Sequence, residues 1–328
     1  MLHKTLILTL LLALAITGCA PASTPTEAPA PVATEISAIS SPQGTEAPAA
    51  TDGLTFTDGL GREVTLEGPA QRIISLAPSN TEILFAIGAG DQVVGRDQLS
   101  DYPAEAATIT DIGSTFEALN TELLVSLESD LVLAAEINTP EQVKQLEDLG
   151  LTVYYLKNPL TLEEMYANLE IVAQLTGHEA NAATLIESLK ARVAAVDEKI
   201  APISSRFSVF YELDATDPAK PFTAGKGTFI TQLIERAGGY NIAAEIDGYP
   251  QMSLEEVVAA DPAFIILGDA RYGVSPASIA QRPGWENLSA VTNGNVVPFN
   301  DDLVSRPGPR LVDALEELAK LLRPELFK

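Results

Sequence analysis

The sequence is poor in the side chains that build metal centres and nucleophilic catalytic sites. Its 328 residues include one cysteine and two histidines. Cys19 has no second cysteine for an internal disulfide, and a cluster of cysteine or histidine metal ligands is excluded. Of the two histidines, His3 lies in the predicted signal peptide. A Ser-His-Asp or Cys-His catalytic set would therefore have to use His178, which stands at the start of a predicted helix. We therefore predict no catalytic residues, no metal site and no intrinsic cofactor.

Basic residues are scarce as well. The chain has 20 lysines and arginines against 45 aspartates and glutamates, which gives a formal net charge of −25. Nucleic-acid-binding surfaces are basic, and so are surfaces that adhere to anionic lipids. The charge therefore excludes nucleic acid as a partner. Hydrophobic residues make up 46% of the chain, which is ample for packed cores.

The first residues carry an apolar run that is too short to span a membrane. Lys4 precedes apolar residues 6–16, which suit the core of a secretory signal but cannot cross about 30 Å of hydrocarbon. The run ends in Ile-Thr-Gly-Cys at 16–19, which resembles the lipobox of bacterial lipoproteins, cut before a cysteine that becomes lipid-modified. We expect a signal peptide at 1–18 and a lipid anchor on Cys19 at the extracytoplasmic face of the cell membrane. A free thiol after an ordinary signal peptide is the alternative.

Residues 19–53 differ in composition from the rest of the chain. After the cysteine they are rich in Pro, Ala, Thr, Ser and Glu and have almost no large apolar side chains. Such a segment cannot bury enough apolar surface to offset its chain entropy. We predict a disordered tether that holds the folded body off the membrane.

A long amphipathic helix is predicted at residues 178–200, near the middle of the folded part. Its apolar side chains recur at steps of three and four, and charged side chains fill the remaining positions. The apolar positions are Leu185, Leu189, Val193, Val196 and Ile200. The helix would span roughly 35 Å, about the width of a small domain. It indicates either a rigid connection between two lobes or a long surface helix of one large domain.

Strand and helix patterns alternate on both sides of this helix. The predicted strands are 72–76, 93–94, 131–134 and 153–156 before it, and 207–211, 264–267 and 296–299 after it. Ser79 or Asn80 is expected to cap the helix that follows the first of these strands. Such alternation favours mostly parallel sheets with helices on both faces.

The predicted fold class is therefore α/β, with two Rossmann-like lobes and a ligand cleft between them. We place the N-terminal lobe at 54–176, the connecting helix at 177–201 and the C-terminal lobe at 202–328. An internal similarity supports two related lobes. A shift that aligns Glu122 with Glu255 also aligns 131–133 with 264–266. Chance likeness of two helix-strand units is the alternative.

Several segments together resemble a known family. They are 72–82 (RIISLAPSNTE), 94–95 (VG), 100–103 (SDYP), 113–114 (GS), Glu122 and 130–133 (DLVL) in the first half, and 221–226 (PFTAGK), 238–241 (GGYN), Ser253 with Glu255, and 306–310 (RPGPR) in the second. In order and spacing the chain resembles the periplasmic binding proteins of cobalamin and iron-siderophore ABC importers, from about residue 56 to 322. That resemblance implies two α/β lobes joined by one long helix.

The resemblance also implies a docking surface. In the family, one glutamate at the tip of each lobe meets arginines of the membrane-embedded permease, and the matching positions here are Glu122 and Glu255. Both are also expected in the first turn of a helix, where the helix dipole favours an acid without any partner. Family members commonly act as monomers.

The ligand is expected in the cleft between the lobes, on loops that follow strand ends. The candidates are Leu99, Phe116, Tyr211, Phe222, Tyr272, Asp302 and Arg306. Cobalamin binders carry Tyr and Trp where this chain has Leu99 and Phe116. Anionic ferric catecholates would need several cations, for which Arg96, Lys226, Arg271 and Arg306 are available. Haem would need an axial ligand such as a tyrosine, and a corrinoid is our first choice.

The resemblance thus implies a solute-binding lipoprotein that performs no chemistry. It would capture a metal-containing chelate, a corrinoid such as cobalamin or a ferric siderophore, and deliver it to an ABC permease and its ATPase. Two alternatives stay open on the same architecture. One is an exported enzyme that uses Asp302 as acid or base, and the other is an envelope sensor whose partner is a receptor domain.

Overall fold

The computed structural model describes residues 53–328. The predicted signal peptide at 1–18, Cys19 and nearly all of the predicted tether lie outside the described residues. Among the residues that are described, no helix is both long enough and apolar enough to cross a membrane.

The first part of the described chain forms a five-stranded parallel sheet in the order β5-β4-β3-β6-β7. Its strands are β3 (Ile73–Ser75), β4 (Val93–Arg96), β5 (Thr110–Asp111), β6 (Leu131–Ala135) and β7 (Val153–Leu156). Its helices are α1 (Pro78–Ala86), α2 (Thr121–Ser126), α3 (Pro140–Asp148) and α4 (Leu162–Thr176), with 3-10 turns η1 (Gly90–Gln92) and η2 (Ala104–Thr108). An antiparallel hairpin of β1 (Leu54–Thr57) and β2 (Glu63–Leu66) precedes the sheet.

Both faces of this sheet are covered by helices. Successive side chains of a strand point to opposite faces. Leu131 and Leu133 pack in one core with α1, α4 and the long helix α5 (Glu179–Ile200), whereas Val132 and Ala134 pack in another with α2 and α3. Strands β3, β6 and β7 are therefore buried on both sides, which explains their nearly continuous apolar sequences, whereas both residues of the edge strand β5 are exposed.

The second part forms another sheet, in which β10, β8, β11 and β12 run parallel and β9 pairs antiparallel with β8. Its strands are β8 (Phe207–Asp214), β9 (Phe222–Thr223), β10 (Gly239–Asn241), β11 (Phe264–Leu267) and β12 (Val296–Pro298). Its helices are α6 (Phe229–Arg236), α7 (Leu254–Ala260), α8 (Pro276–Ile279), α9 (Ser289–Thr292), α10 (Asp302–Ser305) and α11 (Leu311–Leu322), with 3-10 turns η3 (Gly268–Tyr272), η4 (Trp285–Asn287) and η5 (Pro324–Leu326). Here α6 and α11 cover one face, and α7, α8 and α9 cover the other.

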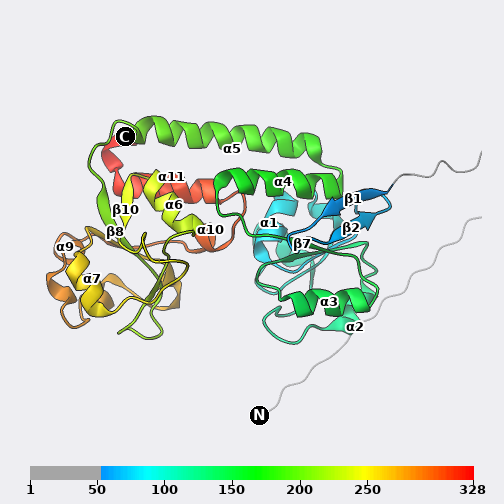
Figure 1. Cartoon of the computed structure of the whole chain (residues 1–328), viewed down its shortest axis with the longest axis horizontal. Helices are drawn as coiled ribbons and strands as arrows, with labels where there is room; N and C mark the ends of the chain where they lie inside the picture. Colours follow the sequence, from blue (N-terminus) through cyan, green and yellow to red (C-terminus); the bar gives the residue numbers. More distant parts are fainter. Residues whose placement is uncertain (1–52) are drawn as a thin grey trace, which may run out of the picture. The chain divides into compact units, whose positions relative to one another are not determined.

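The helix α5 joins the two lobes. It lies along α4 of the first lobe and α11 of the second (Figure 1). Its buried stripe, Ala182, Ile186, Leu189, Val193, Val196 and Ile200, belongs to a core that contains residues of both lobes. One continuous hydrophobic core therefore runs beneath the helix from lobe to lobe.

The structure confirms the predicted α/β fold with two lobes and one long helix. Three details differ. Leu185 is only partly buried, and Ile186 takes its place in the stripe. The short strands β5, β9 and β10 were not predicted, because two or three residues show no periodicity. Neither Ser79 nor Asn80 caps α1, since that helix starts earlier, with Ala77 as its N-cap and Pro78 at its first position.

The two lobes repeat one helix-strand unit. The helix α2 is followed by β6 as α7 is followed by β11, with the offset that aligns Glu122 with Glu255. Both helices are followed by an acidic residue in the left-handed backbone region, Glu128 with φ 49° and Asp261 with φ 40°. Non-glycine residues rarely adopt this conformation. Its recurrence at matching positions argues against chance likeness of the two units.

Candidate functional site: a pocket between the lobes

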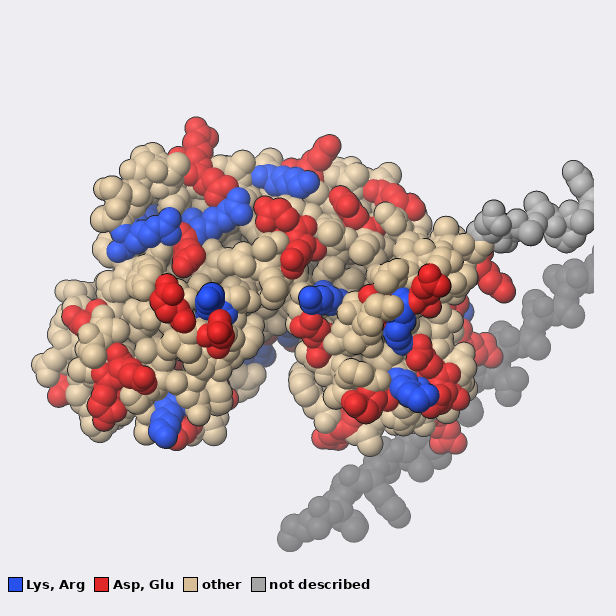
Figure 2. Space-filling view, in the orientation of Figure 1, with Lys and Arg blue, Asp and Glu red and all other residues tan. Residues whose placement is uncertain are grey.

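A pocket of about 310 Å³ is lined by residues of both lobes. The first lobe contributes Ala77, Pro78, Ser79, Gln98, Leu99, Asp101, Phe116, Ile137 and Asn158, and the second contributes Arg271, Tyr272, Asp301, Asp302, Ser305, Arg306 and Pro307. Most of these residues follow the carboxyl ends of parallel strands, where α/β sheets commonly bind their ligands. Figure 2 shows the hollow between the lobes.

Apolar side chains in this pocket are unusually exposed. Phe116 is 69% exposed, Tyr272 is 81% exposed and Leu99 is 45% exposed. Phe116 and Leu99 come from the first lobe and Tyr272 from the second. Leaving large rings in water forgoes burial energy, so exposed aromatic side chains in a pocket are typical of a ligand surface.

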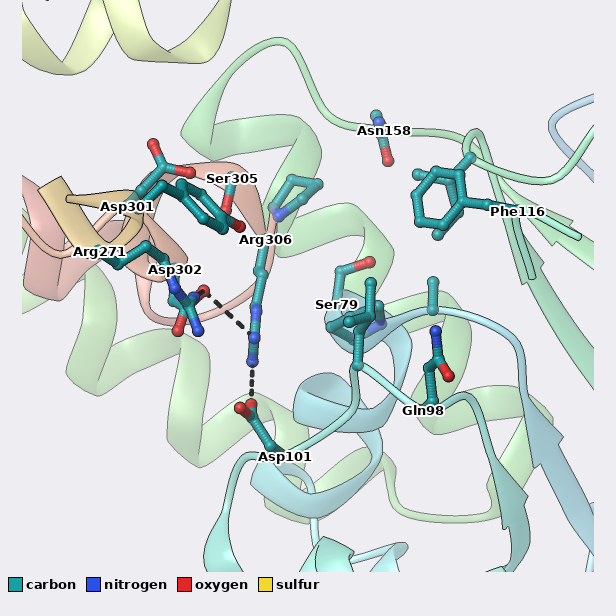
Figure 3. Close-up of a pocket in the computed structure, with 16 residues that line it drawn as sticks. Ser79, Gln98, Asp101, Phe116, Asn158, Arg271, Asp301, Asp302, Ser305 and Arg306 are labelled. Atoms are coloured by element: carbon teal, nitrogen blue, oxygen red, sulfur yellow. Dashed lines mark hydrogen bonds and ion pairs between the residues drawn. The ribbon is translucent and has the colours of Figure 1, made fainter. Parts of the chain in front are cut away.

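The charged side of the pocket is centred on Arg306, which is 8% exposed. Its Nη1 donates to Asp101 Oδ1 at 2.6 Å and to Glu82 Oε1 at 3.3 Å, and its Nη2 lies 3.2 Å from Asp302 Oδ1. Figure 3 shows Arg306 between Asp101 and Asp302, with Phe116 on the opposite side of the pocket. Burial opposes ionisation of Asp101, but the hydrogen bond and charge of Arg306 prevail and lower its pKa.

The other charged groups of the pocket are paired as well. Arg271 Nη1 donates to Asp302 Oδ1 at 2.6 Å, so Asp302 contacts two arginines. Asp301 Oδ1 accepts a hydrogen bond from the hydroxyl of Tyr211 at 2.7 Å. Burial raises the pKa of the Asp301 carboxyl above its usual range, although Tyr211 and Ser305 partly offset that rise. Both arginines that line the pocket are thus already neutralised by carboxylates.

The structure brings five of the seven predicted ligand residues to the pocket wall: Leu99, Phe116, Tyr272, Asp302 and Arg306. Tyr211 and Phe222 do not line it. Tyr211 is fully buried in the central strand β8, where its ring faces the core and only its hydroxyl reaches a pocket residue, Asp301. Phe222 lies on the edge strand β9 and is 39% exposed.

Two of the four candidate cations also lie elsewhere. Arg271 and Arg306 line the pocket, whereas Arg96 pairs with Asp111 at 3.0 Å and Lys226 forms a backbone bridge with Asp247. The sequence analysis did not select Gln98, Asp101 or Asp301. Asp101 stands within a quoted family segment, and its place after the predicted strand at 93–94 was the available signal.

The predicted docking residues sit on the repeated helices. Glu122 and Glu255 are exposed in the first turns of α2 and α7. The capping glutamate of α7 is Glu256, whose side chain accepts from the backbone N–H of Ser253 at 2.7 Å. Neither Glu122 nor Glu255 forms a salt bridge within residues 53–328. Both carboxylates are therefore available to a partner.

Two α/β lobes, one connecting helix and a concave pocket between the lobes form an arrangement suited to binding a small molecule. The family model described as periplasmic binding protein matches residues 73–303. This chain belongs to the periplasmic binding protein family, which confirms the resemblance found in the sequence.

Known proteins similar to this chain are named as binding proteins. The uncharacterized ABC transporter substrate-binding lipoprotein YvrC of Bacillus subtilis is 35% identical over 84% of this chain and 87% of its own length. A cobalamin-binding protein of Halobacterium salinarum is 31% identical over 81% of this chain and 73% of its own length. The solved structure of the periplasmic heme-binding protein RhuT from Roseiflexus matches with a TM-score of 0.70 and 28% identity, covering 78% of this chain and 99% of that one.

Proposed function

We propose that this protein is the solute-binding component of an ABC importer and that the pocket between its lobes holds the solute. The observation that carries the proposal is the pairing of highly exposed Phe116 and Tyr272, from opposite lobes, in one pocket. Binding there would bury both rings and tie the ligand to both halves of the molecule. The name of the Bacillus subtilis relative supports a transport role, and that of the Halobacterium salinarum relative supports solute binding.

The preferred ligand is a corrinoid such as cobalamin. Arg271 and Arg306 already pair with carboxylates, so an anionic ferric catecholate would have to displace Asp101 or Asp302. A corrinoid needs no such exchange, because amide groups surround its ring. Gln98 and Asn158 supply uncharged hydrogen-bonding partners for those amides, and Phe116 supplies an apolar face. The volume of about 310 Å³ would hold part of such a macrocycle and leave the rest in solvent.

Haem is the second candidate, and one observation favours it. The phenol of Tyr272 stands in the pocket with most of its surface in water, and a tyrosine can serve as an axial ligand of haem iron. Haem offers a flat apolar ring to the two aromatic side chains, but its propionates are anionic. They would have to compete with the carboxylates that now hold Arg271 and Arg306.

Delivery would use the two repeated helices. Glu122 and Glu255, one on each lobe, would meet basic side chains of the permease at a separation set by the rigid body. Charge pairs across an interface steer association and fix its register. Lipidation of Cys19 would keep the protein beside the permease. The enzyme alternative gains no support, because the Asp302 carboxylate is held by Arg271 and Arg306.

The function is tested by thermal unfolding of the full-length chain against cobalamin, cobinamide, haem and ferric siderophores. A ligand at 100 times its dissociation constant should add about 2.7 kcal/mol to the free energy of unfolding. That increment corresponds to a shift of several degrees in Tm. A shift with cobalamin and cobinamide supports the corrinoid proposal, a shift with haem alone favours the second candidate, and no shift with any of them contradicts both.

A further inference from the structure

We propose that Glu82 is a positioning residue that fixes the width of the cleft before any ligand arrives. With Arg306 and Arg310 it forms what we call the interlobe clamp. Glu82 belongs to α1 of the first lobe, whereas both arginines belong to the second. The inference rests on the proposed function only in taking the cleft as the ligand site.

The clamp is a buried carboxylate shared by two arginines. Glu82 is 2% exposed. Arg310 Nε donates to Glu82 Oε2 at 2.7 Å, and Arg310 Nη2 donates to Glu82 Oε1. Arg306 Nη1 reaches Glu82 Oε1 at 3.3 Å. A bidentate contact of this kind fixes orientation as well as distance.

Each arginine also holds a second point on the first lobe. Arg306 Nη1 donates to Asp101, and the guanidinium of Arg310 lies 4.0 Å from the ring centre of Tyr102. The clamp thus binds both α1 and the loop that follows β4. Two separate points of attachment oppose rotation of one lobe against the other better than a single contact can.

The interlobe clamp lies where it can oppose rotation of the lobes about the connecting helix. Arg306 lines the pocket, whereas Glu82 and Arg310 line a groove of about 490 Å³ together with Leu185 and Leu189 of α5. The clamp therefore stands between the connecting helix and the ligand site. A hinge motion about α5 would have to break it.

Breaking the clamp would leave buried charges unpaired. A buried carboxylate without its arginine is strongly unfavourable, because neither water nor another cation replaces the lost contact. The closed ion pairs thus favour one lobe spacing in the free protein. When the cleft already has its ligand-bound width, little of the free energy of ligand binding is lost to reordering the lobes.

The test is the distance between the lobes, measured by electron spin resonance between labels on Gln145→Cys and Ala277→Cys in the full-length chain with Cys19→Ser. Both labelled positions are exposed, one on each lobe. The matched control is Glu212→Gln, which breaks a buried carboxylate-arginine pair with Arg282 inside the second lobe alone. The test variant is Glu82→Gln. Glu82→Gln and Glu212→Gln each break a buried ion pair and should lower the free energy of unfolding. Only Glu82→Gln should alter the distance between the lobes.

We expect a narrow distance distribution for the unsubstituted protein and for Glu212→Gln, and a distribution about twice as wide for Glu82→Gln. If Glu82→Gln does not fold, Arg310→Lys keeps the charge, loses the bidentate contact and should widen the distribution to a smaller extent. A distribution as narrow in the Glu82→Gln or Arg310→Lys variant as in the control overturns the inference. The distance measurement needs no ligand. It can therefore refute the interlobe clamp without refuting the proposed function, and a failed ligand-binding test would leave the clamp untouched.

Discussion

The hydroxyl of Tyr211 donates a hydrogen bond to Asp301 across 2.7 Å and so connects the central strand of the second lobe to the pocket. Tyr211 itself is fully buried. The residue thus acts behind the pocket, where it stabilises the ionised carboxylate of a residue that does line it.

Tyr211→Phe should therefore make Asp301 harder to ionise. Burial already raises the pKa of Asp301, and the hydrogen bond from Tyr211 offsets part of that rise. Without it the folded-state pKa rises further, so stability is lost as pH rises through that higher value. We expect a loss of about 1 kcal/mol at pH 8 and a smaller loss at pH 4, measured by urea unfolding. Equal losses at both pH values would contradict this explanation.

A second buried carboxyl should make stability depend on pH. Asp269 is 4% exposed, and burial together with the charge of Glu212 raises its pKa to about 7. Because the folded protein binds this proton more tightly than the unfolded chain does, the Asp269 carboxyl stabilises the fold at pH values below 3.8, the ordinary pKa of aspartate. That contribution is lost as the pH rises through about 7. Stability should therefore fall between these values.

Asp269→Asn removes this titration and keeps an oxygen that can accept from the backbone N–H of Ala215. We expect the variant to be more stable than the unsubstituted protein at pH 8, by no more than about 4 kcal/mol, with a smaller gain at pH 5. Urea unfolding at the two pH values measures the difference. A gain that does not depend on pH would show that Asp269 is ionised throughout.

Tyr272→Phe separates the two candidate ligands. It keeps the exposed ring and removes the hydroxyl that would bind haem iron. Corrinoid affinity should change less than about threefold, which is under 1 kcal/mol, whereas haem affinity should drop by at least about tenfold. Absorption titrations with both ligands measure the two effects. If cobalamin binding falls as steeply as haem binding, the hydroxyl contacts both ligands and this distinction is wrong.

Reversing the charge of both docking residues should stop transport but not ligand binding. In Glu122→Arg with Glu255→Arg, two exposed carboxylates become like-charged with the basic side chains proposed on the permease. The control reverses Glu286 and Glu317, which are also exposed, to give the same net charge. Uptake assays in cells should show at least about a tenfold loss for the docking variant alone. Unchanged uptake would remove these residues from the docking surface.

The sequence was sufficient to predict most of the fold, because burial imposes regular patterns. The apolar run of β11 and the three- and four-residue steps of α5 fix the type of each element. The long helix α5 was predicted at 178–200 and is observed at Glu179–Ile200.

The pocket was harder to predict, because its residues follow strand ends without any period. Tyr211 and Phe222 were candidates for the cleft, yet the sequence did not indicate that the ring of Tyr211 faces the core. The role of Glu82 was also hidden. A glutamate in an apolar helix gives no sign of the two arginines, more than 200 positions later in the chain, that hold it.

The most direct test of the central claim is equilibrium binding of cobalamin to the full-length chain, measured by isothermal titration calorimetry. We predict saturable binding of one cobalamin per chain, weakened about tenfold or more by Phe116→Ala. Leu149→Ala, which truncates an exposed apolar side chain outside the pocket, should leave the affinity unchanged. A cobalamin affinity that neither Phe116→Ala nor Leu149→Ala changes would contradict a corrinoid site in the cleft between the lobes. So would the absence of cobalamin binding.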